Sequence, residues 1–155
     1  MSKFDDYQTK MDDRDCLVES LGTLGHKPVL AKDQIKGDQL YGYQGDARAQ
    51  RAHVILPRKT LSGSSNDIGF RRNEDGTFTA VVSQYDSQIG YGKEWLAKVG
   101  KTYLEKKAVK DLTAQGYTDF HREEVKNAAG TMDVRITATA PPVYAQAQQV
   151  GFTRS

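Results

Sequence analysis

Short runs of alternating or apolar positions predict that much of this chain is β-strand. Strands are expected within residues 2–10, 28–35, 51–57, 66–82 (two strands), 117–125 and 131–138. Asp75-Gly76 lies between β-forming residues, and an Asp-Gly pair in that setting is a strong hairpin signal. Ala129-Gly130 marks a second hairpin. The stretch 40–45 is typical of a turn or a bulged edge strand.

Two other segments repeat their apolar positions with the period of a helix. The first carries leucines at i, i+4 and i+7: Leu17, Leu21 and Leu24. Asp12 or Asp13 can cap its start, and Gly25 can end it in the left-handed conformation. The second runs from Gly92 to Gly116 and has one broad apolar stripe: Trp95, Leu96, Val99, Tyr103 and Leu112. Gly100 costs roughly 1 kcal/mol inside it, which a close contact with the sheet would explain.

Strands and helices do not alternate strictly, so a doubly wound parallel sheet is disfavoured. The order favours an α+β fold, with an antiparallel sheet covered on one face by two helices. A ferredoxin-like βαββαβ core with an extra central hairpin fits this order. We expect the opposite face of the sheet to be free for contacts. Residues 1–140 are predicted to form a single domain, and residues 141–155 a flexible C-terminal tail, because Pro141-Pro142 ends the pattern.

Composition narrows the class of protein only slightly. The 155 residues include 22 Lys and Arg against 20 Asp and Glu, a net charge of +2 that neither demands nor excludes a polyanionic partner. Cys16 is the only cysteine, which excludes an intramolecular disulfide and a four-thiolate metal site within one chain. No apolar run approaches the roughly 20 residues that span a bilayer. The simplest interpretation is a cytoplasmic protein.

No set of residues in the sequence predicts catalysis, a cofactor or a metal site. The three histidines, His26, His53 and His121, form no local ligand pair. His26 follows the end of a helix, where the dipole favours a cation, and His53 lies on an apolar strand as a core or edge residue. Cys16 is near a helix start, but the acidic first turn opposes a thiolate, so a buried residue is favoured. Gly90-Tyr91-Gly92-Lys93 could receive an anion, although a helix-initiating turn is the simpler interpretation.

Basic and aromatic residues concentrate in residues 41–72, which we call the basic-aromatic segment. Between Asp46 and Arg72 there are six positive and two negative side chains. The predicted binding residues are Tyr41, Tyr43, Arg48, Arg51, Arg58, Phe70, Arg71 and Arg72. Such a set could stack bases and contact phosphates. Adjacent Arg71 and Arg72 face opposite ways on a strand, so a solvated rim is favoured over a nucleic-acid site.

The order of several motifs resembles the Ycf35 family, a group of uncharacterised proteins with the DUF1257 domain. The matching motifs are Met1-Ser2-Lys3-Phe4, Tyr41-Gly42-Tyr43-Gln44-Gly45, Ala52-His53-Val54-Ile55, Asp67-Ile68-Gly69-Phe70-Arg71 with Asn73, Trp95-Leu96-Ala97-Lys98-Val99 with Tyr103, and Ala114-Gln115-Gly116-Tyr117. The chain departs from the family at Gln84-Tyr85-Asp86, where an aromatic is usual, and beyond Pro141. The resemblance implies a protein of a cyanobacterium, a plastid (in its stroma) or a phage of such a host, with no catalytic residues to transfer.

Three hypotheses for function follow. The leading one is a non-catalytic interaction module, an accessory or regulatory factor with a protein partner that the sequence does not identify. The alternative is a nucleic-acid-binding protein that uses the basic-aromatic segment. The third is a small-ligand protein or enzyme whose site is assembled in three dimensions from His53, Arg71, Tyr43 or Cys16.

Overall fold

The structure is a computed structural model that describes residues 3–142. The chain divides into two compact units, Met1–Tyr103 and Leu104–Ser155. The first unit contains β1 (Phe4–Gln8), α1 (Arg14–Thr23), β2 (Val29–Leu30), β3 (Asp38–Tyr41), β4 (Ala47–Ala52), β5 (Val54–Leu56), the short 3₁₀ helix η1 (Arg58–Thr60), β6 (Ile68–Arg72), β7 (Phe78–Ser83) and α2 (Gln84–Gln88). Helix α3 (Lys93–Ala114) begins in the first unit and ends in the second, which continues with β8 (Thr118–Lys126) and β9 (Met132–Thr139).

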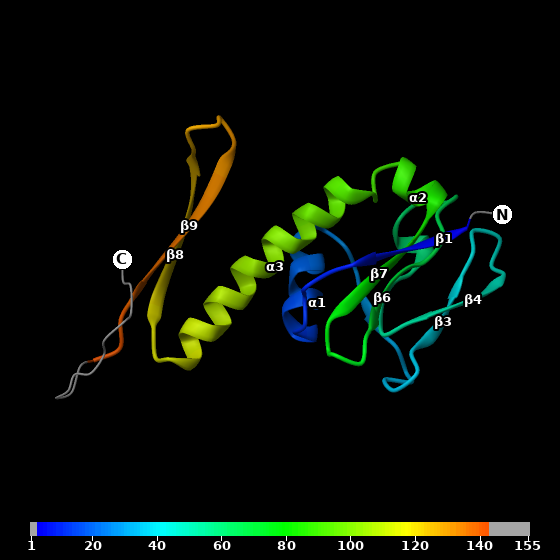
Figure 1. The fold of residues 1–155 in the computed structure, drawn as a ribbon, viewed down its shortest axis with the longest axis horizontal. Helices are drawn as coiled ribbons and strands as arrows, with labels where there is room; N and C mark the ends of the chain where they lie inside the picture. Colours follow the sequence, from blue (N-terminus) through cyan, green and yellow to red (C-terminus); the bar gives the residue numbers. More distant parts are fainter. Residues whose placement is uncertain (1–2, 143–155) are drawn as a thin grey trace. The chain divides into compact units, whose positions relative to one another are not determined.

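The centre of the first unit is a five-stranded sheet with the order β1-β7-β6-β5-β2. Its strands β1, β7 and β6 lie side by side in Figure 1. Every neighbouring pair is antiparallel, so the predicted α+β class with an antiparallel sheet is confirmed. The strand order differs from that of a ferredoxin-like core, because β1 lies at an edge of the sheet beside β7. Strands β5, β6 and β7, which follow one another in the chain, instead lie side by side as an antiparallel meander.

Both predicted hairpins are present, and they share one turn chemistry. The sequences Asn73-Glu74-Asp75-Gly76-Thr77 and Asn127-Ala128-Ala129-Gly130-Thr131 each join two strands. In both turns the asparagine N–H donates to the threonine carbonyl, and its side-chain amide donates to the threonine hydroxyl. The glycines have φ of 88° and 86°, a conformation that glycine adopts without strain.

Helices α1 and α3 cover one face of the sheet with the main apolar core. The core takes Leu17 and Leu21 from α1, and Trp95, Val99 and Tyr103 from α3, as the helical period predicted. The Asp13 carboxylate caps α1 by accepting the Cys16 N–H, and Cys16 is buried. The Tyr103 hydroxyl accepts the N–H groups of Asp12 and Asp13 at 3.0 and 2.9 Å, which fixes the start of α1 against α3.

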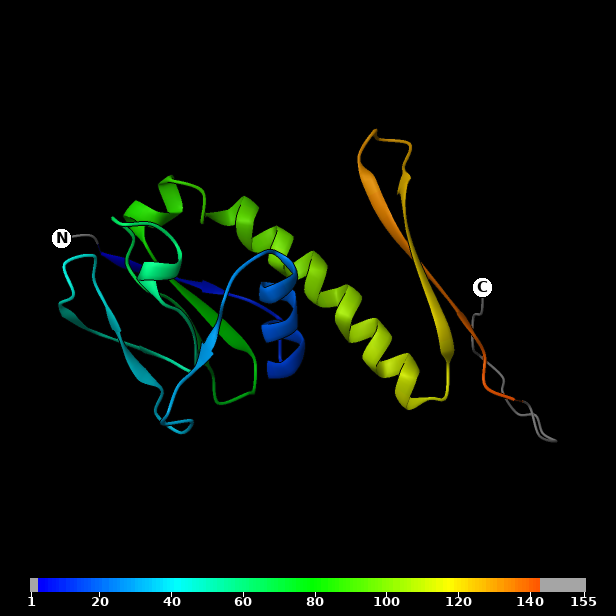
Figure 2. The same ribbon diagram turned by 180° about the vertical axis from the view of Figure 1, so that it is seen from behind.

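The hairpin β3–β4 covers the opposite face of the sheet, which corrects the expectation of an open face (Figure 2). Leu40 and Ala52 from the hairpin form a second buried cluster with Ile55 and Val81 from the sheet. The approach is close at Gly69, where an added Cβ would lie 2.4 Å from the Ala52 Cβ. Glycine at this position therefore lets the hairpin pack directly on β6.

Three local predictions differ from the structure. The strand expected at 28–35 is only the two-residue β2, because the following residues form a loop whose amides bond to aspartate side chains. The strand expected at 51–57 is divided at His53 between β4 and β5. In addition, the short helix α2 was not predicted. A Cβ at Gly100 would meet nothing within 4 Å, so close contact does not explain that glycine.

In the second unit, β8 and β9 form a two-stranded antiparallel sheet. Its register shifts between Thr118 and His121, where Asp119 has a φ of 55°. The predicted single domain over residues 1–140 stays a prediction. The predicted tail falls, from residue 143 onward, outside the described residues.

Candidate functional site

Asp67, directly before β6, connects hairpin β3–β4 to the central sheet. Its Oδ2 accepts the N–H of Tyr41 at 2.8 Å, its Oδ1 accepts the N–H of Arg58 at 2.7 Å, and its own N–H donates to the Tyr41 carbonyl. Burial raises the pKa of the Asp67 carboxyl above its usual value, and the two N–H donors oppose that rise. Asp67 therefore makes two hydrogen bonds to the backbone of Tyr41 and a third to the backbone of Arg58.

Asn66 positions the turn of the same hairpin. Its side-chain oxygen accepts the Tyr43 N–H at 2.9 Å, and its Nδ2 donates to Ser83 Oγ at 2.9 Å and to Asp86 Oδ2 at 3.1 Å. Ser83 Oγ in turn donates to Asp86 Oδ2 at 2.6 Å. Because Asn66, Ser83 and Asp86 are all buried, this network links the turn to the first residues of α2.

A pocket of about 440 Å³ lies beside β2 and hairpin β3–β4, and we call it the edge pocket. It is lined by Val29, Lys32, Asp38, Gln39, Tyr41, Arg51, Ile55, Pro57 and Asp67. The side of the pocket formed by Val29 and Tyr41 is apolar, and these two residues are 47 % and 45 % exposed. The two cationic and two anionic side chains of the lining balance in charge, so the pocket has no strong preference for ligands of either sign.

The loop that borders the edge pocket is organised by two carboxylates. Asp38 accepts the N–H groups of Lys32 and Asp33 at 2.9 and 3.1 Å, and Asp33 accepts those of Ile35 and Lys36 at 3.0 and 2.9 Å. These backbone hydrogen bonds lower the pKa of both carboxyls. The loop thereby presents Ile35, whose residue surface is 89 % exposed.

The arginines of the predicted binding set all contact other parts of the first unit. Arg51 Nε donates to the Gly37 carbonyl and Arg58 Nη1 to the Tyr43 carbonyl, both at 2.9 Å. Arg48 lies over the Phe4 ring at 5.1 Å. These contacts give the cations roles inside the fold.

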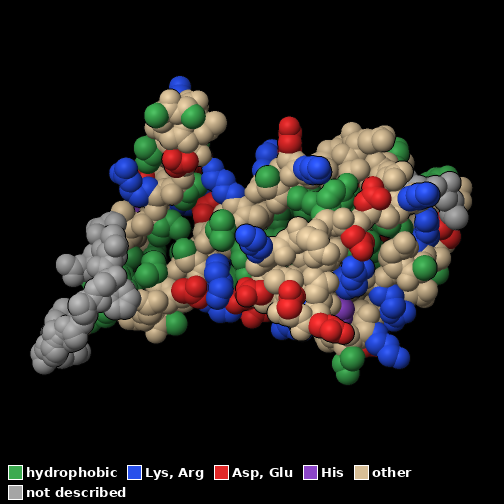
Figure 3. Space-filling model, viewed as in Figure 1, with side chains coloured by type: hydrophobic (Ala, Val, Ile, Leu, Met, Phe, Trp, Pro, Cys, Tyr) green, Lys and Arg blue, Asp and Glu red, His purple; other side chains and the backbone are tan. Residues whose placement is uncertain are grey.

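The two arginines of β6, Arg71 and Arg72, also contact other residues of the first unit. Arg71 forms a 3.0 Å ion pair with Asp6, and Arg72 lies over the Phe78 ring at 5.4 Å. On the face that Figure 3 shows, Lys and Arg side chains are interspersed with Asp and Glu. Each of the five arginines in the basic-aromatic segment thus has a partner within the first unit.

Phe70 and His53 are interior residues rather than surface ones. The Phe70 side chain is buried in the main core, 6.3 Å from the Trp95 ring, so it is not available to stack on a ligand at the surface. His53 is 4 % exposed; its Nδ1 accepts the Arg72 N–H, and its Nε2 lies 3.1 Å from the Ile35 carbonyl. That arrangement places the ring proton on Nε2 and uses both nitrogens, as expected of a core residue.

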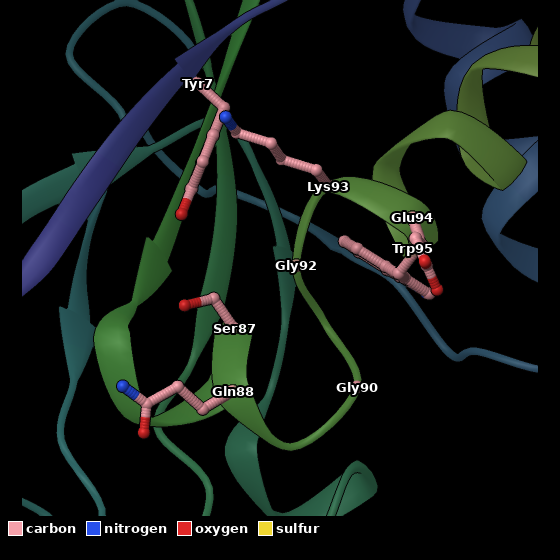
Figure 4. A pocket seen from close by; sticks show the side chains of 8 residues that line it. All are labelled: Tyr7, Ser87, Gln88, Gly90, Gly92, Lys93, Glu94 and Trp95. Carbon is pink, nitrogen blue, oxygen red and sulfur yellow. The ribbon is translucent and has the colours of Figure 1, made fainter.

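A second pocket, of about 460 Å³, lies at the turn before α3 (Figure 4). It is lined by Tyr7, Ser87, Gln88, Gly90, Gly92, Lys93, Glu94 and Trp95. The Lys93 side chain extends toward Tyr7, while Glu94 lies on the helix next to it. Neither this pocket nor the edge pocket gathers Cys16, His53, Tyr43 or Arg71, the residues of the enzyme hypothesis.

The histidines do not come together with other ligands. Among residues 3–142, no group of three His, Cys, Asp or Glu side chains is placed to hold a metal ion. His26 Nε2 accepts the indole N–H of Trp95 at 3.1 Å, and burial lowers the His26 pKa. The cation expected from the helix dipole is therefore disfavoured at His26.

Comparison with known protein families assigns most of the chain to one family. The model of the family described as "Protein of unknown function (DUF1257)" matches residues 20–135. The chain belongs to the DUF1257 family. No curated protein and no solved structure matches it. The matched range includes every residue that lines the edge pocket, so the pocket lies within the DUF1257 domain.

Asn66 and Asp67 of this DUF1257 protein were not predicted as site residues. The available signal was two polar residues directly before the apolar strand β6, where a buried side chain commonly bonds to a neighbouring backbone. Val29 and Lys32 gave no such signal, since their place beside the pocket depends on tertiary structure. Within the described residues of the DUF1257 protein, no helix is both long and apolar enough to cross a membrane.

Proposed function

We propose that this DUF1257 protein is a non-catalytic interaction module, accessory or regulatory in role, and that a protein partner docks at the edge pocket. One observation carries the proposal: apolar and aromatic side chains stay exposed on and near β2 and β3, while the neighbouring arginines are engaged within the fold. The exposed residues are Val29 (47 %), Leu30 (46 %), Ile35 (89 %), Tyr41 (45 %) and Tyr43 (42 %). Tyrosine beside aliphatic side chains is typical of protein interfaces.

The edge of β2 supports a protein partner further. Ala31 donates its N–H to the His53 carbonyl, and Leu30 is paired with Val54. Because hydrogen-bonding direction alternates along an antiparallel strand, the backbone N–H and C=O of Leu30 face away from β5. An extended segment of a partner can pair with this edge while its side chains enter the edge pocket.

The resemblance to Ycf35 proteins adds biological context to the proposal. This resemblance supports a protein of a photosynthetic organism, in the cytoplasm or the plastid stroma, or of a phage of such a host. It also favours residues 1–140 as the functional domain, with residues 141–155 as an addition to it.

Site-specific photo-crosslinking tests the protein partner. A photoreactive residue at Tyr41 in the full chain, irradiated in cyanobacterial extract, is expected to give one discrete adduct that excess unlabelled protein competes away. Leu104 is the control position, because it is 68 % exposed and belongs to the second unit. Equal adducts at Tyr41 and Leu104, or none at Tyr41, would overturn the proposal.

Nucleic-acid binding is the second candidate, because Tyr41 is half exposed in a pocket that Lys32 and Arg51 also line, and Tyr43 is half exposed two residues further along the chain. Fluorescence anisotropy with single-stranded RNA and DNA over a salt series separates the two. A protein that contacts phosphates loses affinity steeply as salt rises. We expect weak binding with little dependence on salt, since the arginines have partners within the fold; a steep dependence that Arg51→Gln reduces would favour the nucleic-acid function instead.

A further inference from the structure

Strand β9 has an outer edge with which no strand pairs within residues 3–142. It belongs to a sheet of only two strands, β8 and β9. An isolated two-stranded hairpin is marginally stable in water, and natural proteins usually protect such edges with lysine, proline or a bulge. Residues 132–139 contain no lysine and no proline, and their pairing to β8 is regular from Met132 to Thr137.

The register shows which backbone groups face outward. Asn127 donates its N–H to the Thr131 carbonyl, so these two residues form a hydrogen-bonded pair at the turn. Hydrogen-bonded pairs recur at every second residue of an antiparallel ladder. With Val125 opposite Asp133 and Glu123 opposite Arg135, the backbone groups of Asp133 and Arg135 point to β8. Those of Met132, Val134 and Ile136 therefore point away from β8.

The side chains along this edge form a pattern that is complementary to itself. About Val134, the sequence Thr131-Met132-Asp133-Val134-Arg135-Ile136-Thr137 has a threonine at each end, an apolar residue on each side (Met132 and Ile136) and opposite charges at Asp133 and Arg135. If two copies pair antiparallel about a two-fold axis at Val134, Met132 faces Ile136 and Asp133 faces Arg135, twice each. Outward-facing residues then meet outward-facing residues, which is what a continuous antiparallel ladder requires.

Other symmetric registers fit less well. An axis at Arg135 places two arginines directly opposite one another, and an axis at Ile136 places Arg135 opposite a threonine. Within one hairpin, Arg135 already forms a 3.0 Å ion pair with Glu123 on β8. In the Val134 register, charges of alternating sign therefore continue from Glu123 through Arg135 to the aspartate of the second copy.

We propose that β9 pairs with β9 of a second copy of this chain, to form a four-stranded sheet centred on Val134. The partner is a second copy because the charge pattern is complementary to itself under a two-fold axis. This places a homodimer contact in the second unit, separate from the edge pocket of the first unit.

The first test is the molar mass of the full chain by sedimentation equilibrium over a range of concentrations. We expect a reversible dimer of the 17.2 kDa chain. Val134→Pro removes an outward N–H without removing a bond to β8, and Asp133→Lys places like charges opposite Arg135. Each is expected to weaken the dimer roughly tenfold or more. Lys126→Glu, a charge change on β8, is the matched control and should leave the dimer intact.

A charge-exchange experiment tests the register. One chain carries Asp133→Lys, and the other carries Arg135→Glu with Glu123→Gln, which removes the carboxylate otherwise left beside the new one. Each chain alone should be monomeric, and their mixture should form a heterodimer. Circular dichroism of each variant checks that the fold is kept. A monomer at all concentrations, or a dimer that Val134→Pro and Asp133→Lys leave unchanged, would overturn the proposal.

Discussion

Gly69 is where hairpin β3–β4 packs most closely on the central sheet, and Gly69→Ala tests how the hairpin is held. The new Cβ would lie 2.4 Å from the Ala52 Cβ and 3.0 and 3.1 Å from the two δ-carbons of Leu40. The leucine can change rotamer, but the Ala52 Cβ is attached to the backbone of β4, so the strand itself must move. Overpacking of this kind costs about 1–3 kcal/mol, and the short contact to a backbone-fixed atom puts Gly69→Ala at about 2–3 kcal/mol.

Urea unfolding followed by tryptophan fluorescence measures this loss. Trp95 is the only tryptophan and lies in the core of the first unit, so its emission reports on that unit. We expect the midpoint to fall in Gly69→Ala with little change in the slope of the transition. Gly63→Ala is the matched control, because a Cβ there meets nothing within 4 Å. Its effect should stay within about 0.5 kcal/mol.

A compensating substitution distinguishes this contact from a general loss of stability. Ala52→Gly removes the methyl group that the new Cβ would meet. The double variant should therefore be more stable than the sum of the two single effects predicts, by roughly 1–2 kcal/mol. Strictly additive effects, or a Gly69→Ala protein as stable as the parent, would refute the packing of the hairpin on β6.

Three further predictions concern single residues. Burial lowers the His26 pKa from its usual value of 6.5. The stability gained from the neutral ring is therefore present above pH 6.5 and is lost as the pH falls through the lowered pKa. Acidification should accordingly lower the urea midpoint less in His26→Gln than in the parent protein. Asp67→Asn keeps one oxygen acceptor but turns an amide toward the other N–H donor, and should cost about 1.5–3 kcal/mol in the same assay. Gly100→Ala meets no neighbouring atom within 4 Å and should raise the thermal midpoint, with a gain of about 0.5–1 kcal/mol.

Features set by local chemistry were predictable from the sequence. Both asparagine-to-threonine turns, the Asp13 cap and the apolar stripe of α3 depend on residues within a few positions of one another. The hairpin β3–β4 was missed for the converse reason. The sequence of β4, Ala-Arg-Ala-Gln-Arg-Ala, contains no β-branched or aromatic residue, and its strand is formed by pairing with β3 and packing of Ala52 on the sheet.

The candidate site shows the same division between local and tertiary information. The sequence placed Tyr41 and Arg51 in a binding segment, and both line the edge pocket. It could not show that Arg48 lies over Phe4, because a cation–π contact between residues so far apart in the chain depends on the fold. Nor could it separate Tyr41, which is half exposed, from Phe70, which is buried. The sequence gives the charge and type of each residue, whereas the partner of a charged side chain depends on the tertiary structure.

Coverage of both faces of the central sheet leaves its edges as the places where a partner strand can pair. Strand β1 presents Asp5 and Asp6 at one edge, and charged residues discourage pairing with another chain. Strand β2, at the other edge, consists of Val29 and Leu30 and carries no charge. Strand β9 belongs to the separate two-stranded sheet, and its charged residues, Asp133 and Arg135, are complementary to those of a second copy. If β2 binds a different protein and β9 binds a second copy, the two contacts should be separable. Val134→Pro should then weaken the dimer while the adduct at Tyr41 persists, and loss of both together would show that partner binding requires the dimer.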